Sequence, residues 1–185
     1  MQEAIRVLRK KEVSISNKEE ESMQLAILLH DIGHGPFSHT TEATLAGVIS
    51  HEEISLHIMN KLNEQFNGAL DVAIAIFTNQ YHKKFMHQLI VGQIDLDRMD
   101  YLKRDSFYSG ATEGNINSKR IIEMMTVVDD QLSFEEKCIY SIEKFLMARR
   151  LMYWQVYLHK TSLSAEFLLV KILERVRHCV ENGIP

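Results

Sequence analysis

Cysteine, proline and long hydrophobic runs are all scarce in this 185-residue chain. The two cysteines, Cys138 and Cys179, lie far apart and form no C-x-x-C pair, so the sequence indicates neither a disulfide framework nor a thiolate metal site. No apolar run approaches the ~20 residues that span a bilayer, and the first residues lack the hydrophobic segment of a signal peptide. We therefore expect a globular protein of the reducing cytoplasm, without a membrane partner.

The chain also lacks a strong excess of charge of either sign. Its formal net charge is -4 and its pI is near 6.1. This balance gives no general attraction to nucleic acid or to an anionic membrane. Any binding of phosphate must therefore come from local groups.

The scarcity of helix breakers predicts an all-α fold. There are 2 prolines and 8 glycines, and 45% of the residues are hydrophobic, enough for one substantial core. The strand signal is limited to one small β-hairpin near residues 125–133, around the Asp129-Asp130 turn. We expect helices over residues 2–12, 18–32, 38–47, 51–66, 69–79, 83–109 with a break, 117–124, 134–160 and 163–181.

Two helix starts have the pattern of a capping box. Ser50-x-x-Glu53 places His51 in the first turn of its helix, and Ser133-x-x-Glu136 precedes the long helix that carries Arg149. A glycine-containing loop at 110–115 predicts a division into residues 1–110 and residues 111–185, the second part completing the site formed by the first.

The most informative segment reads His30-Asp31-Ile32-Gly33-His34-Gly35-Pro36-Phe37-Ser38-His39. An adjacent His-Asp pair offers one neutral nitrogen and one anionic oxygen, a set that Zn, Mn, Fe or Ni accepts. Gly33 is placed to be the left-handed residue after the preceding helix, and Gly35-Pro36 allows a sharp turn. A lone His-Asp pair is more often structural, but the density of imidazoles favours a metal and phosphate site.

Two residues further along supply proton chemistry to the same site. Glu42 can hold an imidazole by a hydrogen bond and raise its basicity. His51 lies near the partial positive end of a helix, although a lone histidine at such a position is more often a surface residue.

A second block, residues 95–105, places four polar side chains on one helical face: Asp97, Tyr101, Arg104 and Asp105. A solvated, salt-bridged face is the alternative. A third strip on the long helix contains Arg149, Tyr153, Tyr157 and Lys160, cations and phenols that suit a polyphosphate. Core packing is the alternative for its aromatic residues.

Together these blocks resemble the HD-domain phosphohydrolase superfamily, and more narrowly its deoxynucleoside triphosphate triphosphohydrolase branch, which includes dGTPases. The His-Asp-Ile-Gly-His-Gly-Pro-Phe-Ser-His string is specific for that branch. The match continues, in the same order, through Ser50-His51-Glu52, Asp95-Leu96-Asp97-Arg98-Met99-Asp100-Tyr101, Arg104-Asp105 and Tyr157-Leu158-His159-Lys160.

The resemblance implies a role for each matched residue. The implied metal ligands are His30, Asp31 and Asp97, and the implied catalytic relay is His34, Glu42 and His51. The residues implied to contact the substrate are His39, Arg98, Tyr101, Asp105, Arg149 and Tyr157. Water would attack the α-phosphorus of a deoxynucleoside triphosphate with the help of a divalent metal (Mn, Mg, Fe, Zn or Ni), giving deoxynucleoside and tripolyphosphate. Self-association into a homo-oligomer is expected by analogy.

One departure from the family bears on activity. The family's metal site includes a histidine upstream of the His-Asp pair, and residues 1–29 contain none. We therefore expect a truncated bacterial member that binds metal weakly. A nucleoside monophosphate phosphatase of the same fold and a catalytically impaired nucleotide-binding module remain the alternatives. Leu158 stands where better-known relatives carry a polar residue near the base or sugar, so base preference stays open.

Overall fold

The computed structural model of the chain describes residues 1–42, 44 and 49–183, with residues 38 and 39 described by their backbone alone. Apart from one hairpin the described elements are helical, which confirms the all-α fold. The α-helices are α1 (Gln2–Lys10), α2 (Asn17–Leu29), α3 (Ser38–Thr41), α4 (His51–Gln65), α5 (Asp71–Phe77), α6 (Lys84–Gln88), α7 (Leu96–Ser109), α8 (Ser118–Glu123), α9 (Ile139–Met152) and α10 (Lys160–Glu181). Two short 3₁₀ turns, Thr112–Gly114 and Glu136–Cys138, and a π-helical turn, Tyr153–Tyr157, complete the set.

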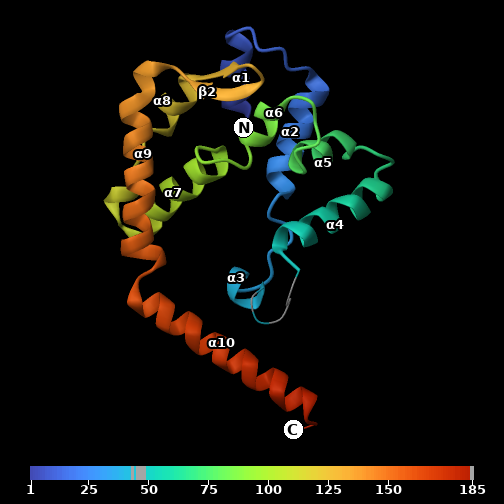
Figure 1. The fold of residues 1–185 in the computed structure, drawn as a ribbon, viewed down its shortest axis with the longest axis vertical. Helices are drawn as coiled ribbons and strands as arrows, with labels where there is room; N and C mark the ends of the chain where they lie inside the picture. The colour runs from blue at the N-terminus through green and yellow to red at the C-terminus, as the bar shows by residue number, and fades with distance from the viewer. Residues whose placement is uncertain (43, 45–48, 184–185) are drawn as a thin grey trace.

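The helices surround a site between the end of α2 and the starts of α4 and α7. Figure 1 shows α9 along one side of the molecule and α10 leaving its end to cross the end opposite the hairpin. Helix α2 packs on α5, α7 packs on α9, and α10 passes beside α3. The core is rich in methionine, whose flexible side chain fills irregular gaps. Its buried methionines are Met23, Met59, Met86, Met99, Met125 and Met152.

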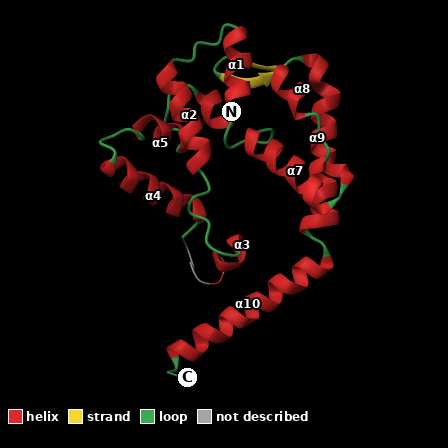
Figure 2. Ribbon diagram, turned by 180° about the vertical axis from the view of Figure 1, so that it is seen from behind, coloured by secondary structure: helices red, strands yellow, loops and turns green. Residues whose placement is uncertain are grey.

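The predicted hairpin is present at the end of the molecule that holds α1 (Figure 2). Strand β1 (Met125–Val128) pairs antiparallel with β2 (Gln131–Phe134), with Val128 opposite Gln131. The two turn residues, Asp129 and Asp130, have φ of 50° and 63°. Two left-handed residues in a two-residue loop match the twist of the paired strands, and aspartate tolerates that conformation better than most side chains.

Helix boundaries follow the local caps where the caps form. Ser50 Oγ accepts from the N–H of Glu53 while the Glu53 side chain accepts from the N–H of Ser50, which confirms this capping box. Ser16 and Glu19 form a capping box of the same kind at the start of α2, which was not predicted.

The second predicted capping box is wrong. Ser133 lies in β2, and its hydroxyl donates to the carbonyl of Gln131. Pairing with β1 takes the segment through Phe134 into the sheet, so α9 begins only at Ile139 and has no side-chain cap. The helix predicted over residues 134–160 is therefore a strand, a 3₁₀ turn, α9 and the π-helical turn in succession.

The break predicted within residues 83–109 lies between α6 and α7, where Asp95 caps α7 and starts a new helix. Of the helix predicted over residues 38–47, the structure describes α3 and π-helical backbone at residues 42 and 44, and residues 43 and 45–47 lie outside the described residues.

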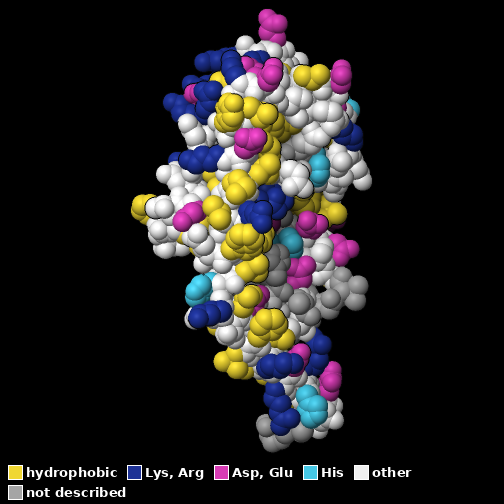
Figure 3. All heavy atoms as spheres, turned by 60° about the vertical axis from the view of Figure 1, so that its left-hand side comes forward, with side chains coloured by type: hydrophobic (Ala, Val, Ile, Leu, Met, Phe, Trp, Pro, Cys, Tyr) yellow, Lys and Arg dark blue, Asp and Glu magenta, His cyan; other side chains and the backbone are white. Residues whose placement is uncertain are grey.

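Helix α10 begins at Lys160, three residues earlier than predicted, and is the least enclosed element. None of its residues, all of which the structure describes, is buried. Hydrophobic side chains form a band along α9 and onto α10 (Figure 3). Its exposed members include Tyr140, Met147, Trp154, Leu158, Phe167, Leu168 and Val180. Among the described helices, none combines the length and the hydropathy of a membrane span.

Candidate metal and phosphate site

The first metal candidate is His30, the residue at which α2 ends. Its Nδ1 lies 2.7 Å from the carbonyl oxygen of Ile27. A carbonyl only accepts, so Nδ1 carries the proton and Nε2 presents its lone pair. That Nε2 is buried and has no hydrogen-bond partner among the described residues. A buried nitrogen lone pair without a donor is a position that a cation would satisfy.

Two carboxylates face this lone pair. His30 Nε2 lies 3.4 Å from Asp31 Oδ2 and 3.7 Å from Asp97 Oδ1. Ligands about 2.0–2.1 Å from a tetrahedral ion lie roughly 3.4 Å apart, so these spacings fit one divalent cation. Burial raises the pKa of Asp97, and although His30 opposes this shift, the nearby Asp95 and Asp31 carboxylates reinforce it. A cation would relieve the crowding of negative charge.

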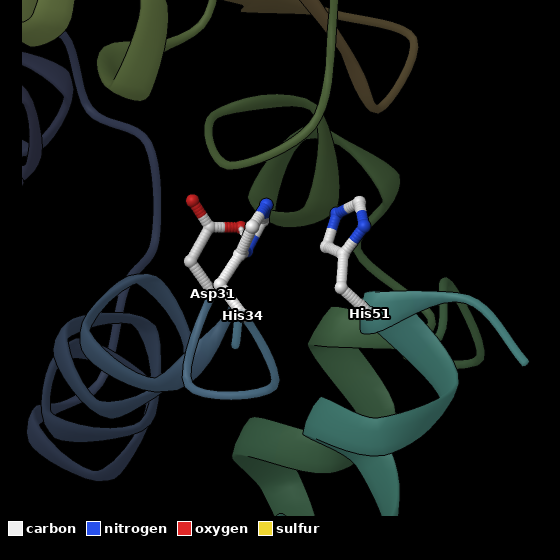
Figure 4. A group of neighbouring side chains, drawn as sticks. All are labelled: Asp31, His34 and His51. Atoms are coloured by element: carbon white, nitrogen blue, oxygen red, sulfur yellow. Dashed lines mark ion pairs between the residues drawn. The ribbon is translucent and has the colours of Figure 1, made fainter. Parts of the chain in front are cut away.

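A second group of possible ligands shares Asp31. His34 Nδ1 lies 3.7 Å from Asp31 Oδ1, and Asp31, His34 and His51 hold their ligand atoms within 4.8 Å of one another. Figure 4 shows Asp31 and His34 on the turn after α2 and His51 opposite them at the start of α4. The arrangement can hold a cation or pass a proton, and Asp31 belongs to both groups.

Glu42 holds His51 by two atoms. His51 Nδ1 lies 3.0 Å from Glu42 Oε2, and the His51 backbone N–H donates to Glu42 Oε1 over 3.1 Å. The rings of His51 and His34 are tilted by 39° with centroids 4.0 Å apart. The three residues predicted as a relay therefore lie together, next to the metal candidates.

Gly33 sets the distance between the turn after α2 and helix α4. The sequence predicted a different role for it, as a left-handed residue after the helix. It does not adopt the left-handed conformation expected of a residue that ends a helix. Its N–H donates to Ser55 Oγ over 2.9 Å, and a Cβ at this position would lie 2.2 Å from the carbonyl oxygen of His51. Only glycine lets the turn pack this closely against α4.

A cavity of about 560 Å³ opens beside the metal candidates. This volume is in the range of small-molecule sites. Four of the predicted substrate residues line it: Arg98, Tyr101, Asp105 and Tyr157. Tyr153, from the strip of cations and phenols predicted on the long helix, lines it too. Four further lining residues were not predicted to have a role: Glu52, Ile90, Val91 and Asp95. Of these, Asp95 had a usable signal, because an aspartate before a helical pattern is a preferred N-cap.

Tyr157 and Asp105 are joined to each other. The Tyr157 hydroxyl donates to Asp105 Oδ2 over 2.6 Å. Burial raises the pKa of Tyr157, and the hydrogen bond to the Asp105 carboxylate raises it further. Tyr157 therefore keeps its proton across the physiological range, and the pair connects α7 to the π-helical turn.

Four predicted side chains do not line the cavity or are not described: Arg149, Arg104, Lys160 and His39. Arg149 donates from Nη1 to Gln93 Oε1 over 3.3 Å, and its guanidinium carbon lies 6.0 Å from the Tyr153 ring centre. Arg104 is 60% exposed and pairs with Asp100. The side chain of His39 lies outside the described part of the structure.

A second cavity of about 550 Å³ lies beyond the imidazole pair. His34 and His51 form part of the wall of both cavities. The second cavity is mostly apolar and is completed by residues of α10, among them Leu169 and Leu173. Helix α10 therefore reaches the catalytic candidates from outside the first 110 residues.

Comparisons with known proteins agree with this geometry. Residues 3–105 match the HD domain, and residues 116–182 match the HD-associated region. A phosphohydrolase crystal structure from Bacteroides thetaiotaomicron has a TM-score of 0.96 and 56% identity, and the match covers 100% of this chain and 46% of that one.

Curated relatives include an uncharacterized protein, YwfO, of Bacillus subtilis, which is 37% identical over 90% of this chain and 40% of its own length. The Dictyostelium discoideum homolog of the deoxynucleoside triphosphate triphosphohydrolase SAMHD1 is 30% identical over 85% of this chain and 34% of its own. The chain thus spans less than half the length of these relatives. With the His-Asp pair and Asp97 assembled as described, and an HD profile matching residues 3–105, the chain belongs to the HD-domain phosphohydrolase family.

Proposed function

We propose that the chain forms the catalytic part of a metal-dependent phosphohydrolase that converts deoxynucleoside triphosphates into deoxynucleoside and tripolyphosphate. The observation that carries the proposal is the meeting of His30, Asp31 and Asp97 at one edge of the cavity, with the His34–His51 pair beside them. The similarity to a deoxynucleoside triphosphate triphosphohydrolase homolog supports the choice of substrate.

The metal would be held by His30 Nε2 and by oxygens of Asp31 and Asp97. When bound, a divalent ion lowers the pKa of coordinated water and neutralises phosphate charge. Because these ligands line the cavity, water and substrate oxygens would have access to the bound ion, as a catalytic rather than a structural site requires.

The remaining residues bind the substrate and supply a proton. Arg98 lines the cavity with a guanidinium that suits phosphate oxygens. A deoxynucleoside 5′-alkoxide is a very poor leaving group unless it is protonated. Since Glu42 engages Nδ1 of His51, the proton for the leaving oxygen would come from Nε2.

The decisive experiment incubates each deoxynucleoside triphosphate with the protein and Mn²⁺ and resolves tripolyphosphate, pyrophosphate and phosphate. Tripolyphosphate with free deoxynucleoside is the expected result, and it should be absent for Asp97→Asn. Asp100→Asn is the matched control, because Asp100 lies on the same helix but is exposed and paired with Arg104. Release of inorganic phosphate from deoxynucleoside monophosphates alone would instead establish a monophosphatase.

The alternative to the enzyme is a nucleotide-binding module of low activity, in which His30, Asp31 and Asp97 hold no metal. Elemental analysis after chelator dialysis separates the two candidates. One stoichiometric transition metal per chain supports the enzyme, and nucleotide binding without metal or hydrolysis supports the module.

Two further features belong to the same proposal. We place the protein in the cytoplasm, where nucleoside triphosphates are available, and we expect it to act as a homo-oligomer. Neither nucleic acid nor a membrane is a proposed partner.

A further inference from the structure

A buried carboxylate forms part of the cavity wall, at the residue that caps α7. Asp95 is 2% exposed. Its Oδ1 accepts from the N–H of Arg98 over 2.7 Å, and its Oδ2 accepts from the N–H of Gly92 over 2.9 Å. Its Oδ2 also lies 3.1 Å from Arg98 Nε. One side chain therefore closes the 92–95 turn, caps α7 and pairs with the guanidinium of Arg98.

Asp95 and Gly92 together fix the direction of Arg98. Arg98 Nε donates to the carbonyl oxygen of Gly92 over 2.7 Å, on the same edge that faces Asp95. Because the guanidinium is planar, fixing its Nε edge also fixes where the two Nη groups point. Arg98 lines the cavity, so its orientation is set before any ligand arrives. An anion binding there would not bear the full entropic cost of ordering a long side chain.

Helix capping alone does not account for a charged residue at position 95. Asparagine and serine cap helices about as well as aspartate. Burying a carboxylate is costly, and its ion pair seldom contributes net stability. The specific gain from the charge lies in its contact with Arg98.

We propose that Asp95 is a positioning residue that holds the guanidinium of Arg98 toward the phosphates of the substrate. Through the same cap it aligns the first turn of α7, where Asp97 faces His30. The inference rests on the proposed function, since it assumes that Arg98 meets a polyphosphate.

The test is a double-mutant cycle on ligand binding, measured without catalysis. Binding of dATP and of inorganic tripolyphosphate is measured by calorimetry in excess EDTA for wild type, Asp95→Asn, Arg98→Ala and the double variant. Asp95→Asn keeps a cap but loses the charge, and we expect dissociation constants to rise on the order of 10-fold. In the Arg98→Ala background the same change should have an effect of less than about 2-fold, because the residue through which it acts is gone.

Controls separate positioning from folding. Asp100→Asn, the same substitution on the exposed side of α7, should bind both ligands as wild type does. If Asp95→Asn fails to fold by circular dichroism, Arg98→Lys provides the second variant, since it leaves both backbone hydrogen bonds to Asp95 in place and keeps a positive charge, but replaces the planar guanidinium that Asp95 orients with a flexible ammonium group. Arg98→Lys should then show the weakened binding by itself.

The outcomes also separate this inference from the proposed function. Three results would each overturn the positioning role, whether or not the wild-type protein hydrolyses dNTPs. Folded Asp95→Asn could bind as tightly as wild type, or Arg98→Lys could do so. Asp95→Asn could also weaken binding equally in the Arg98→Ala background. A wild-type protein that shows the expected cycle but no hydrolysis with Mn²⁺ would refute the proposed reaction alone. With active protein, Asp95→Asn should raise KM more than it lowers kcat.

Discussion

Replacing Gly33 by alanine tests whether close packing of the turn on α4 positions His51. The new Cβ would lie 2.2 Å from the carbonyl oxygen of His51, 2.5 Å from the amide nitrogen of Ser55 and 2.8 Å from Ser55 Oγ. Two of these three atoms belong to the backbone of the first turns of α4, which cannot rotate away. The turn and α4 must therefore separate by about 1 Å before ordinary contact distances return.

Two effects follow from that displacement. Overpacking of this kind costs about 1–3 kcal/mol. For a chain of this size each kcal/mol lowers the melting temperature by about 2–4 °C. A shift of about 1 Å in a catalytic group can reduce turnover on the order of 10²-fold. We expect Gly33→Ala to show both a lower unfolding midpoint and a larger loss of dNTP hydrolysis than its stability alone explains.

The assay is guanidinium unfolding followed by circular dichroism, together with steady-state hydrolysis at a temperature where the variant is folded. Gly35→Ala is the matched control, because among the atoms that the structure describes its Cβ would meet only Thr41 Oγ1, at an ordinary 3.4 Å. The reasoning is refuted if Gly33→Ala unfolds at the wild-type midpoint with wild-type kcat, or if Gly35→Ala is equally damaging.

Three other predictions concern separate parts of the molecule. His51→Ala should lower kcat on the order of 10²–10⁴-fold while elemental analysis finds the metal content unchanged; loss of the metal would instead make His51 a ligand. Arg149→Ala should raise the KM for dNTPs less than Arg98→Ala does, because Arg149 is engaged by Gln93 and does not line the cavity; equal increases would place both at the phosphates. Burial raises the pKa of Glu19, but hydrogen bonds led by Lys83 outweigh it and lower the pKa to about 2 from 4.5. The resulting stabilisation, about 3 kcal/mol, is present above pH ~4.5 and lost as the pH falls toward 2, so Glu19→Gln should flatten the acid limb of a stability-against-pH curve.

Elements with a local cause could be predicted from the sequence, and those decided by distant contacts could not. The Asp129-Asp130 turn and the Ser50 cap depend on neighbouring residues, and both are present as expected. Ser133 carries the same capping pattern as Ser50, but pairing with β1 outweighs it. The left-handed conformation predicted for Gly33 is wrong, because the position needs glycine for the close approach of α4, which a local pattern does not show.

The candidate site divides in the same way. His30 and Asp31 are adjacent, so their chemistry could be read directly, whereas the approach of Asp97 followed only from the family resemblance. The direction of Arg149 depends on Gln93 in the segment between α6 and α7, a contact that helical spacing does not show. The assigned roles of these residues remain predictions until variants are assayed.

The π-helical turn at the end of α9 makes the register of the C-terminal segment depend on one residue. Leu158 N–H donates to the carbonyl of Tyr153, five positions earlier, over 2.7 Å. Deleting one residue there would replace the wider turn with α-helical spacing and shift the side chains within the turn relative to α7. The contact of Tyr157 with Asp105 would then change, even though no cavity residue had been substituted. Insertions and deletions in this short stretch are therefore expected to reshape the nucleotide cavity more than most point substitutions. Relatives that differ in length here should differ in the shape of the site.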